Sequence, residues 1–372
     1  MQVECKRVFI LGGGFSYYAG LPLTSGFARA LIAASDRETG RSGILVHHLS
    51  KFVRSTFGCK SGSSEDWPSL EDLFTCIDLA ANSGHHLGEG YSAAYLRTVR
   101  RCLIARIIRM LDNRLDKATH KKGEKWEMLK SFLCSVDYAS SAFLSMNWDE
   151  VVERRFRIIH PGKVTLDYGC EAIPVIRSAE GRQIIAAEPN GGPTLRIAKI
   201  HGSVNWLYCD NCQRAFWLQP SQGRHVSNQL LSAVEWRRLG PKRGHGTKPW
   251  TCPFCRKVPL STRLATFSYR KALDFPMFQK SWSTAEGLLR NADTWAFIGY
   301  SLPAADYEFK YLLKRIQLSR QPRPRVVLVT GGDDAEATYK NYQRFFGEEL
   351  RVGKNCFLQG LDKKSTECLL AY

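Results

Sequence analysis

Four cysteines form two pairs whose spacing suits a metal ion. Both pairs have the form Cys-x-x-Cys, and their members are Cys209, Cys212, Cys252 and Cys255. Two thiolates three residues apart can bind one side of a tetrahedral Zn²⁺ ion, and a second pair completes the coordination. Four thiolates leave no open position on the metal, so we expect a structural Zn²⁺ site that takes no part in catalysis. Chance pairing of buried cysteines is the alternative.

A glycine-rich turn near the N-terminus could bind phosphate. Its residues are Gly12, Gly13, Gly14, Phe15 and Ser16, and they follow the apolar run 8–11. Glycines let backbone N–H groups approach a diphosphate, and the next helix adds its partial positive charge. Tyr17 stands where a hydride-transfer fingerprint needs a third glycine, and no Gly-Lys-Ser/Thr follows as in a Walker loop. A structural turn without a ligand remains the alternative.

Polar side chains that could act on a bound nucleotide follow four further apolar runs. They are Asn147 and Asp149 after 142–146, His201 after 195–200, Ser301 after 294–298 and Thr330 after 325–329. An imidazole suits general-base chemistry near neutral pH, although a lone histidine is more often a hydrogen-bonded structural residue. Because ligands bind at the carboxyl ends of parallel strands, we expect these side chains to share one site.

The elements that would position these residues alternate along the chain. Short apolar runs over 8–11, 142–146, 195–200, 294–298 and 325–329 are typical of buried strands, with 355–358 as a candidate sixth. Helical patterns separate the strands, and one helix is expected to start at Thr24 or Ser25. This alternation predicts an α/β fold with a Rossmann-like, doubly wound parallel sheet.

Two segments interrupt the alternation, and we expect both to lie within one catalytic domain over residues 1–372. Residues 45–135 predict a helical insertion after a loop over 36–44. Within it, residues 95–115 predict a basic amphipathic helix with a charged outer face, or alternatively a contact with nucleic acid or another subunit. Residues 208–260 contain both cysteine pairs and predict a small zinc-binding module.

The segment between the cysteine pairs is basic. Residues 213–251 exceed the roughly 15 to 20 residues of a usual zinc ribbon, which predicts a loop insertion. Seven basic residues oppose Glu235 alone: Arg214, Arg224, Arg237, Arg238, Lys242, Arg243 and Lys248. The loop could contact an anionic partner, but we favour a solvated excursion.

The chain as a whole carries a formal net charge of +18 over 372 residues. Such an excess attracts polyanions such as nucleic acid, although a solvated basic surface explains it equally well. No run of about 18 apolar residues is present, the first residues lack a signal-peptide layout, and the other cysteines are scattered. We therefore expect a soluble cytoplasmic protein with free thiols and no membrane contact.

Five segments, in the same order, resemble the sirtuin superfamily. They are Gly12–Ser16 with Ala19–Pro22, Asn147–Asp149, Lys199–Ser203, the two cysteine pairs, and Gly299–Leu302. The resemblance extends over residues 8–306. It implies a Rossmann-like sheet that binds NAD beside a small zinc-bearing domain.

The resemblance also implies a role for each matching residue. Asn147 would position the nicotinamide ribose or the attacking water, and Asp149 would contact the carboxamide. His201 would act as a general base on a ribose hydroxyl or on water. Gly12, Gly14, Ser16 and Ser301 would bind phosphate, within a wider cofactor-binding set of Gly12, Gly13, Gly14, Phe15, Ser16, Gly299, Ser301 and Thr330.

Several departures separate the chain from deacetylating sirtuins. Leu23, Thr24 and Ser25 replace a Phe-Arg, and residues 258–280 lack the Phe-Gly-Glu segment that helps bind an acyl-lysine peptide. Thr330 stands where an Asn is frequent. Instead, residues 69–73, 201–206 and 299–306 resemble a prokaryotic sirtuin-like branch whose members commonly hydrolyse NAD in antiviral defence.

The function expected from this resemblance is an NAD glycohydrolase that produces nicotinamide and ADP-ribose, acting in antiphage defence. An NAD-dependent protein deacylase or ADP-ribosyltransferase is the runner-up. A non-catalytic nucleotide- or nucleic-acid-binding module is a third hypothesis. Because the resemblance uses nearly the whole chain, we expect control by homo-oligomerisation or by a separately encoded sensor or activator protein.

Overall fold

A seven-stranded parallel sheet forms the centre of the molecule, with strand order β11-β10-β9-β1-β2-β6-β3. The computed structural model describes residues 5–32, 40–58, 67–118, 123–188, 191–240, 248–268, 273–347 and 350–371. The strands are β1 (Arg7–Leu11), β2 (Ser141–Ser145), β3 (Thr165–Asp167), β6 (Thr194–Lys199), β9 (Thr294–Ile298), β10 (Arg325–Val329) and β11 (Cys356–Phe357). The predicted α/β, Rossmann-like sheet is confirmed.

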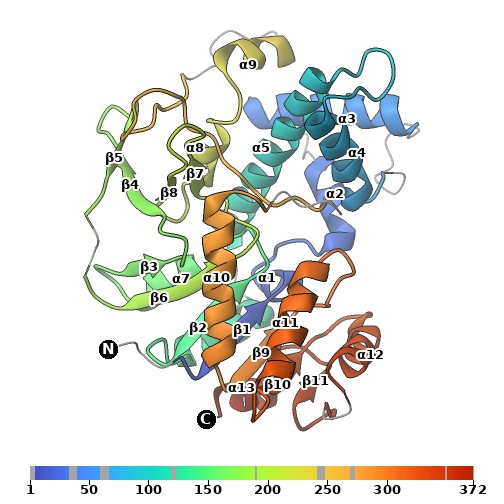
Figure 1. Cartoon of the computed structure of the whole chain (residues 1–372), viewed down its shortest axis with the longest axis vertical. Coiled ribbons are helices and arrows are strands. Elements are labelled where there is room, and N and C mark those ends of the chain that lie inside the picture. Colours follow the sequence, from blue (N-terminus) through green and yellow to red (C-terminus); the bar gives the residue numbers. More distant parts are fainter. Residues whose placement is uncertain are drawn as a thin grey trace.

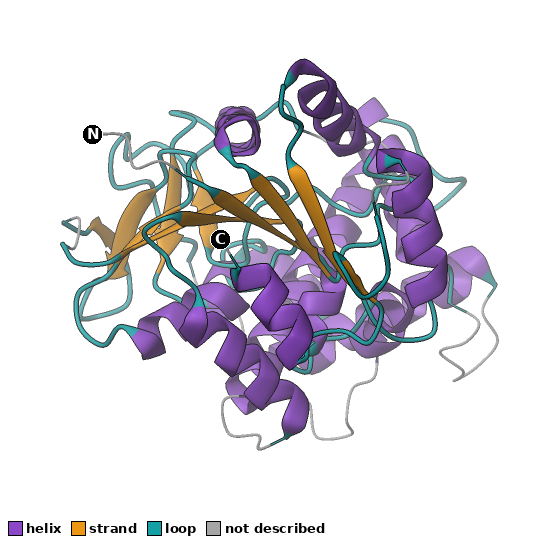
Figure 2. Ribbon diagram, turned by 90° about the horizontal axis from the view of Figure 1, so that it is seen from below, coloured by secondary structure: helices purple, strands orange, loops and turns teal. Residues whose placement is uncertain are grey.

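Helices cover both faces of this sheet (Figure 2). In β1, Phe9 and Leu11 belong to one buried apolar cluster, whereas Val8 and Ile10 belong to the other. Because both faces are buried, the strand is a continuous apolar run without alternation. The face of Val8 packs on α10 (Pro276–Asn291), α11 (Tyr307–Ser319) and α12 (Ala335–Phe346). The face of Phe9 packs on α7 (Val151–Ile159), α13 (Lys363–Leu370) and the helices described next.

The segment predicted as a helical insertion, residues 45–135, is mainly helical, and its helices α3, α4 and α5 lie at the upper right of Figure 1. After α1 (Gly13–Tyr17) and α2 (Thr24–Ile32), these helices are α3 (Arg41–Phe57), α4 (Leu70–Ser83) and α5 (Ala93–Ala118), and α6 (Glu124–Ser135) completes the segment. Helix α3 begins at Arg41, so the loop predicted over 36–44 ends earlier than expected; residues 33–39 lie outside the described residues. Helix α4 begins after Ser69, whose hydroxyl accepts the Asp72 N–H at 3.0 Å.

Several arginines of α5 are used inside the fold. Arg106 is 1% exposed and donates from Nε to the Leu31 carbonyl oxygen at 2.8 Å. Arg100 donates to the carboxylate of Asp78 on α4 at 2.6 Å, and Arg109 is buried as well. The prediction of a charged outer face is wrong for these arginines, because they satisfy polar groups between packed helices.

A second sheet of four strands carries the zinc-ligand segment (Figure 1). Its order is β5-β4-β8-β7, with β4 (Ile173–Arg177), β5 (Ile184–Ala186), β7 (Trp206–Tyr208) and β8 (Ala215–Leu218). The predicted zinc-binding module of residues 208–260 includes β8 of this sheet, whereas β4 and β5 precede it in the chain. The sequence does not mark these two strands as apolar runs, because Ile176 and Ile185 are half-exposed and Pro174 interrupts β4.

The described part of the segment between the cysteine pairs contains two helices, α8 (Gly223–Ser227) and α9 (Ala233–Leu239). Helix α8 packs against α5. In α9, Trp236 is fully buried under the guanidinium of Arg41, and Glu235 forms an ion pair with Arg101 of α5. The favoured interpretation of a solvated excursion is therefore wrong for these helices. Lys242 and Arg243 lie outside the described residues.

A buried ionic cluster joins α5, α7 and the loop before α8. Arg154 forms ion pairs with Asp112, with Asp116 at 2.7 Å and with Glu150 at 3.1 Å. Glu150 Oε2 also accepts the Ser221 N–H at 3.1 Å. Burial raises the pKa of the Glu150 carboxyl to about 7, even though the charge of Arg154 lowers it.

The free energy of unfolding of Glu150→Gln, measured relative to that of the wild type, is expected to be higher at about pH 8 than at about pH 5. The folded pKa of Glu150 lies above its ordinary value of 4.5, so the folded state holds the proton more tightly. Wild-type stability therefore falls as pH rises from about 4.5 through 7, by a term on the order of 3 kcal/mol that a neutral amide lacks. Urea denaturation of both proteins at the two pH values measures this difference. A stability difference between them that does not change with pH would contradict it.

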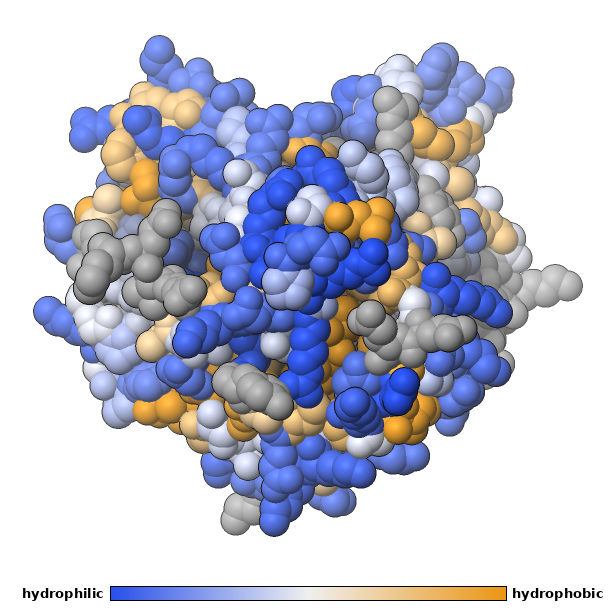
Figure 3. Space-filling view, turned by 60° about the horizontal axis from the view of Figure 1, so that its bottom comes forward, coloured by the Kyte–Doolittle hydropathy of each residue, from blue (hydrophilic) through white to orange (hydrophobic). Residues whose placement is uncertain are grey.

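Among the described residues, no helix combines the length and the apolar character needed to cross a bilayer. The face shown in Figure 3 is mainly hydrophilic, with hydrophobic areas that are small and separate. Scattered exposed apolar side chains of this kind are ordinary on a protein surface and do not call for a partner.

Candidate functional site

The candidate site lies where the strand order of the central sheet reverses. From β1, the strands β2 and β6 extend to one side, whereas β9 and β10 extend to the other. In open α/β sheets, ligands bind in the crevice at such a switch point, beyond the carboxyl ends of the strands. Residues 12–16 follow β1 and Gly299 follows β9, so both predicted loops border the switch point.

Three glycines hold these two loops together. The Gly14 N–H donates to the Gly299 carbonyl oxygen at 2.9 Å, and the Gly12 N–H donates to that of Ile298 at 3.1 Å. A Cβ added to Gly12 would lie 2.5 Å from the Gly299 oxygen, and one added to Gly14 would lie 2.7 Å from the Gly299 Cα. The close approach of the loops therefore requires these glycines, and the two N–H groups already bind protein carbonyls.

Gly13 and Phe15 occupy different surroundings in the same loop. A Cβ added to Gly13 would meet no atom within 4 Å, so this glycine borders open space. The ring of Phe15 is buried in the core, with its centroid 6.4 Å from that of Phe132. Gly13 therefore has room beside it, whereas the side chain of Phe15 packs in the core and supports the loop.

Gly299→Ala is expected to destabilise the protein by about 3 kcal/mol or more, whereas Gly13→Ala should cost less than about 1 kcal/mol. Gly299 has φ +61°, and its added Cβ would lie 2.2 Å from the backbone nitrogen of Phe15. A clash with backbone cannot be relieved by a side-chain rotation. Urea denaturation of the two variants measures the difference, and equal losses would contradict the steric account.

Asn147, Ser16 and Asp149 form one hydrogen-bonded network. Asn147 Nδ2 donates to the Gly12 carbonyl oxygen at 2.7 Å and to Ser16 Oγ at 2.8 Å. Ser16 Oγ donates to Asp149 Oδ2 at 2.6 Å, and Asp149 Oδ1 accepts the Val151 N–H at 3.1 Å. Residues predicted from two distant segments therefore lie together, at the ends of the adjacent strands β1 and β2.

His201 follows β6, the strand beside β2. Its Nδ1 lies 3.1 Å from the Met146 carbonyl oxygen. Because a carbonyl only accepts, we assign the proton of the neutral ring to Nδ1, which leaves Nε2 as the proton-accepting nitrogen. Nε2 lies 3.8 Å from Asp306 Oδ1, and both side chains are buried.

Backbone and side-chain bonds fix His201 relative to the Asn147–Asp149 loop. The Val204 N–H donates to the Trp148 carbonyl oxygen at 2.9 Å. Lys199, which ends β6, donates from Nζ to the Asp149 carbonyl oxygen and forms a buried ion pair with Glu153 at 3.0 Å. These bonds tie the end of β6 to the loop after β2, as a preorganised site requires.

The segment 264–268 lies beside these loops and is hydrogen-bonded to both of them. The Ala265 N–H donates to the His201 carbonyl oxygen at 3.0 Å, and the Ala265 oxygen accepts Trp148 Nε1–H at 3.1 Å. Thr266 donates to Asp78 of α4 at 2.7 Å. The segment therefore connects the helical insertion to the histidine.

Two predicted residues lie apart from this network, and Asp306, for which the sequence predicts no role, lies beside His201. Ser301 is exposed on the loop after β9. Thr330 is buried, and its backbone bonds to Phe357 and Gly360 place it in the β10–β11 contact. Asp306 was not assigned a role, although it closes the 299–306 segment noted for its resemblance.

The four predicted metal ligands converge. The sulfur atoms of Cys209, Cys212, Cys252 and Cys255 all lie within 4.8 Å of one another. Two of the sulfur pairs are 3.6 and 3.7 Å apart. A tetrahedral ion with Zn–S bonds of about 2.3 Å spaces its sulfurs by about 3.8 Å. The cluster therefore fits Zn²⁺, which it would hold with no open position.

Both cysteine pairs adopt the same turn. Gln213 N–H donates to the Cys209 carbonyl oxygen at 2.8 Å, and Arg256 N–H donates to that of Cys252 at 3.0 Å. Gln213 and Arg256 have φ values of 57° and 53°, which residues other than glycine seldom adopt. The Lys257 N–H lowers the pKa of the Cys255 thiol to about 6, which favours the thiolate that a metal binds.

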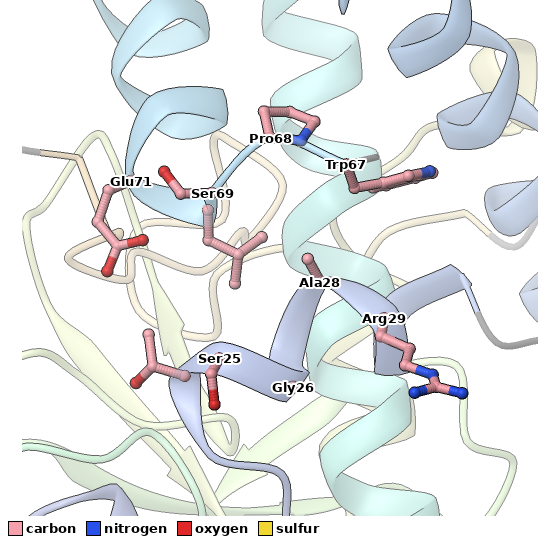
Figure 4. Close-up of a pocket in the computed structure, with 10 residues that line it drawn as sticks. Ser25, Gly26, Ala28, Arg29, Trp67, Pro68, Ser69 and Glu71 are labelled. Carbon is pink, nitrogen blue, oxygen red and sulfur yellow. The ribbon is translucent and has the colours of Figure 1, made fainter. Parts of the chain in front are cut away.

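A cavity of about 440 Å³ opens between the N-terminal ends of α2 and α4 (Figure 4). It is lined by Thr24, Ser25, Gly26, Ala28, Arg29, Trp67, Pro68, Ser69, Leu70 and Glu71. None of these is a predicted catalytic, cofactor-binding or metal-binding residue. The cavity begins two residues after Pro22, so it is near the glycine loop in sequence, but nothing in its lining indicates a ligand.

No family model matches the chain, and no curated protein matches it. One solved structure, described as "The Structural basis of Sirtuin Substrate Affinity", is similar over 84% of this chain and 79% of that chain. The sequence identity is 12% and the TM-score is 0.36. A likeness this distant does not establish a family. The Rossmann-like fold is assigned from the strand order of the central sheet.

Proposed function

We propose that the chain hydrolyses the bond between nicotinamide and ribose in NAD. The observation that carries the proposal is the network of Asn147, Ser16 and Asp149 at the switch point of the sheet, with His201 on the adjacent strand end. Dinucleotides bind at such switch points in open α/β sheets. The resemblance to sirtuins in these segments supplies the identity of the dinucleotide.

The residue types suit this reaction. Departure of nicotinamide leaves an oxocarbenium-like sugar, which needs orientation and a base more than a strong nucleophile. His201 Nε2 would take a proton from the attacking water, whose oxygen then bonds to the ribose carbon, giving ADP-ribose. Asn147 would orient the ribose or the water, and Asp149 would contact the carboxamide. The four-cysteine cluster would hold Zn²⁺ for stability alone.

Hydrolysis is favoured over deacylation by two features of the sequence. Leu23–Ser25 replaces the Phe-Arg, and residues 258–280 lack the Phe-Gly-Glu of deacetylating sirtuins. By the same resemblance to a prokaryotic branch, we propose that the activity serves antiphage defence.

Incubation of the protein with NAD alone tests the proposal. We expect nicotinamide and ADP-ribose in equal amounts, with no acyl-peptide required, measured by chromatography. Release of nicotinamide only when an acetylated peptide is added would indicate a deacylase instead. Intact NAD together with salt-dependent DNA binding would indicate a binding module.

A further inference from the structure

We propose that Asp306 is a positioning residue that stabilises the protonated form of His201 and so sets the pH range in which the histidine accepts a proton. The inference rests on the general-base role proposed for His201. It adds a second acid to the site, supplied by the loop after β9 on the other side of the switch point.

The contact is specific to the nitrogen that takes the proton. His201 Nδ1 faces the Met146 carbonyl oxygen at 3.1 Å, and Nε2 faces Asp306 Oδ1 at 3.8 Å. The side chains of His201 and Asp306 are 9% and 7% exposed, so water screens their interaction weakly. A carboxylate at this distance favours the imidazolium that forms when Nε2 accepts a proton.

Asp306 is held by a chain of two tyrosines. Tyr300 donates from its hydroxyl to Asp306 Oδ2 at 2.7 Å, and Tyr342 donates to the Tyr300 carbonyl oxygen at 2.8 Å. Burial raises the pKa of both phenols well above 10. The tyrosines therefore stay protonated and donate, which leaves Asp306 as a hydrogen-bond acceptor.

The path of the chain brings this acid to the histidine. Asp306 immediately precedes α11, at the end of the loop after β9, whereas His201 follows β6. Strands β1 and β2 separate β9 from β6 in the sheet, so the loop 299–306 crosses their carboxyl ends. Leu302, with φ 54°, turns the loop within this crossing.

The other charged groups on the neighbouring elements have partners of their own. Lys199 pairs with Glu153 between β6 and α7. Asp149, on the loop after β2, is bonded to Ser16 and to the Val151 N–H. On the adjacent segment 262–268, Arg263 pairs with Asp210 at 2.6 Å. The carboxylate that faces Nε2 is that of Asp306.

The test is an NMR titration of the histidine rings in wild type and Asp306→Asn, with His201→Ala to assign the resonance. Removing the carboxylate charge should lower the pKa of His201 by about one unit or more. Tyr300→Phe is the matched control, because it removes a hydrogen bond to Asp306 and keeps the charge, so the pKa should not fall. Asp306→Ser, which leaves a hydroxyl for Tyr300, is the second variant if the amide impairs folding. An unchanged pKa in folded variants would overturn the inference.

The pH profile of NAD cleavage gives a second readout. In Asp306→Asn, the acidic limb of the profile should move to lower pH by as much as the pKa of His201 falls in the titration. The maximal rate should also fall, because a histidine of lower pKa is a weaker base. A wild type that leaves NAD intact would contradict the proposed function, yet the titration would still decide the role of Asp306. A lower rate with an unshifted limb would indicate a purely structural role and would also overturn the inference.

Discussion

His201→Ala is expected to reduce NAD cleavage by about 10²- to 10⁴-fold, the usual contribution of a positioned general base. Alanine removes the only group proposed to accept the proton of the attacking water. The neighbouring Lys199–Glu153 ion pair and the Val204–Trp148 bond remain, so the fold of the site should survive. Steady-state rates of nicotinamide release measure the effect, and a thermal melt checks that the variant is folded.

Two further variants make this test specific. Asn147→Ala should lose activity to a similar degree, because it removes the amide that binds Gly12 and Ser16 and that would orient the sugar. His47→Ala changes an exposed histidine on α3 and should leave the rate unaltered. Equal rates in wild type, His201→Ala and Asn147→Ala would end the assignment of this site.

Loss of the metal is expected to have the largest effect on stability. Apparent binding free energies for structural Zn²⁺ in small domains reach about 10 to 16 kcal/mol, and this energy is folding energy. Among the described residues, the backbone hydrogen bonds that join the segment with the second cysteine pair to the second sheet are the two between Tyr208 and Ser261. Cys252→Ser, or a strong chelator, should therefore unfold this part of the protein well below the wild-type melting temperature.

Elemental analysis and thermal melting together measure this prediction. We expect one zinc per chain in wild type and a large loss in Cys252→Ser. Cys134→Ser is the matched control, because Cys134 is exposed and distant in sequence from the cluster. A protein that binds no zinc, or a Cys252→Ser variant that melts like wild type, would show that the four thiols are not a metal site.

Much of the central sheet could be predicted because its strands are buried on both faces. The strands at 294–298 and 325–329 were placed to the residue, and β2 and β6 differ from prediction by one residue at each end. Continuous apolar runs mark such strands clearly. The strands β3 and β5 have three residues each, and β4 contains Pro174; all three are partly exposed, so neither a continuous apolar run nor an alternation distinguishes them.

The candidate site was predictable where it depends on strand ends. Parallel strands bring their carboxyl ends to one edge, so Asn147, Asp149 and Ser16 could be placed together before their contacts were known. The pairing of Asp306 with His201 could not, because it depends on a loop that crosses two strands. Likewise, a charge pattern along α5 cannot show that Arg106 points inward, since burial depends on the neighbouring helices.

The glycine contact between the β1 and β9 loops also makes one side of the candidate site rigid. Two backbones in contact cannot move apart without losing the Gly14–Gly299 hydrogen bond and the packing around it. That side of the candidate site is therefore rigid, and any conformational change of the site is expected on the opposite side. There, the segment 264–268 is bonded to α4 through Thr266 and Asp78 and to the His201 carbonyl oxygen through Ala265, so a displacement of α4 would also move the segment that contacts His201.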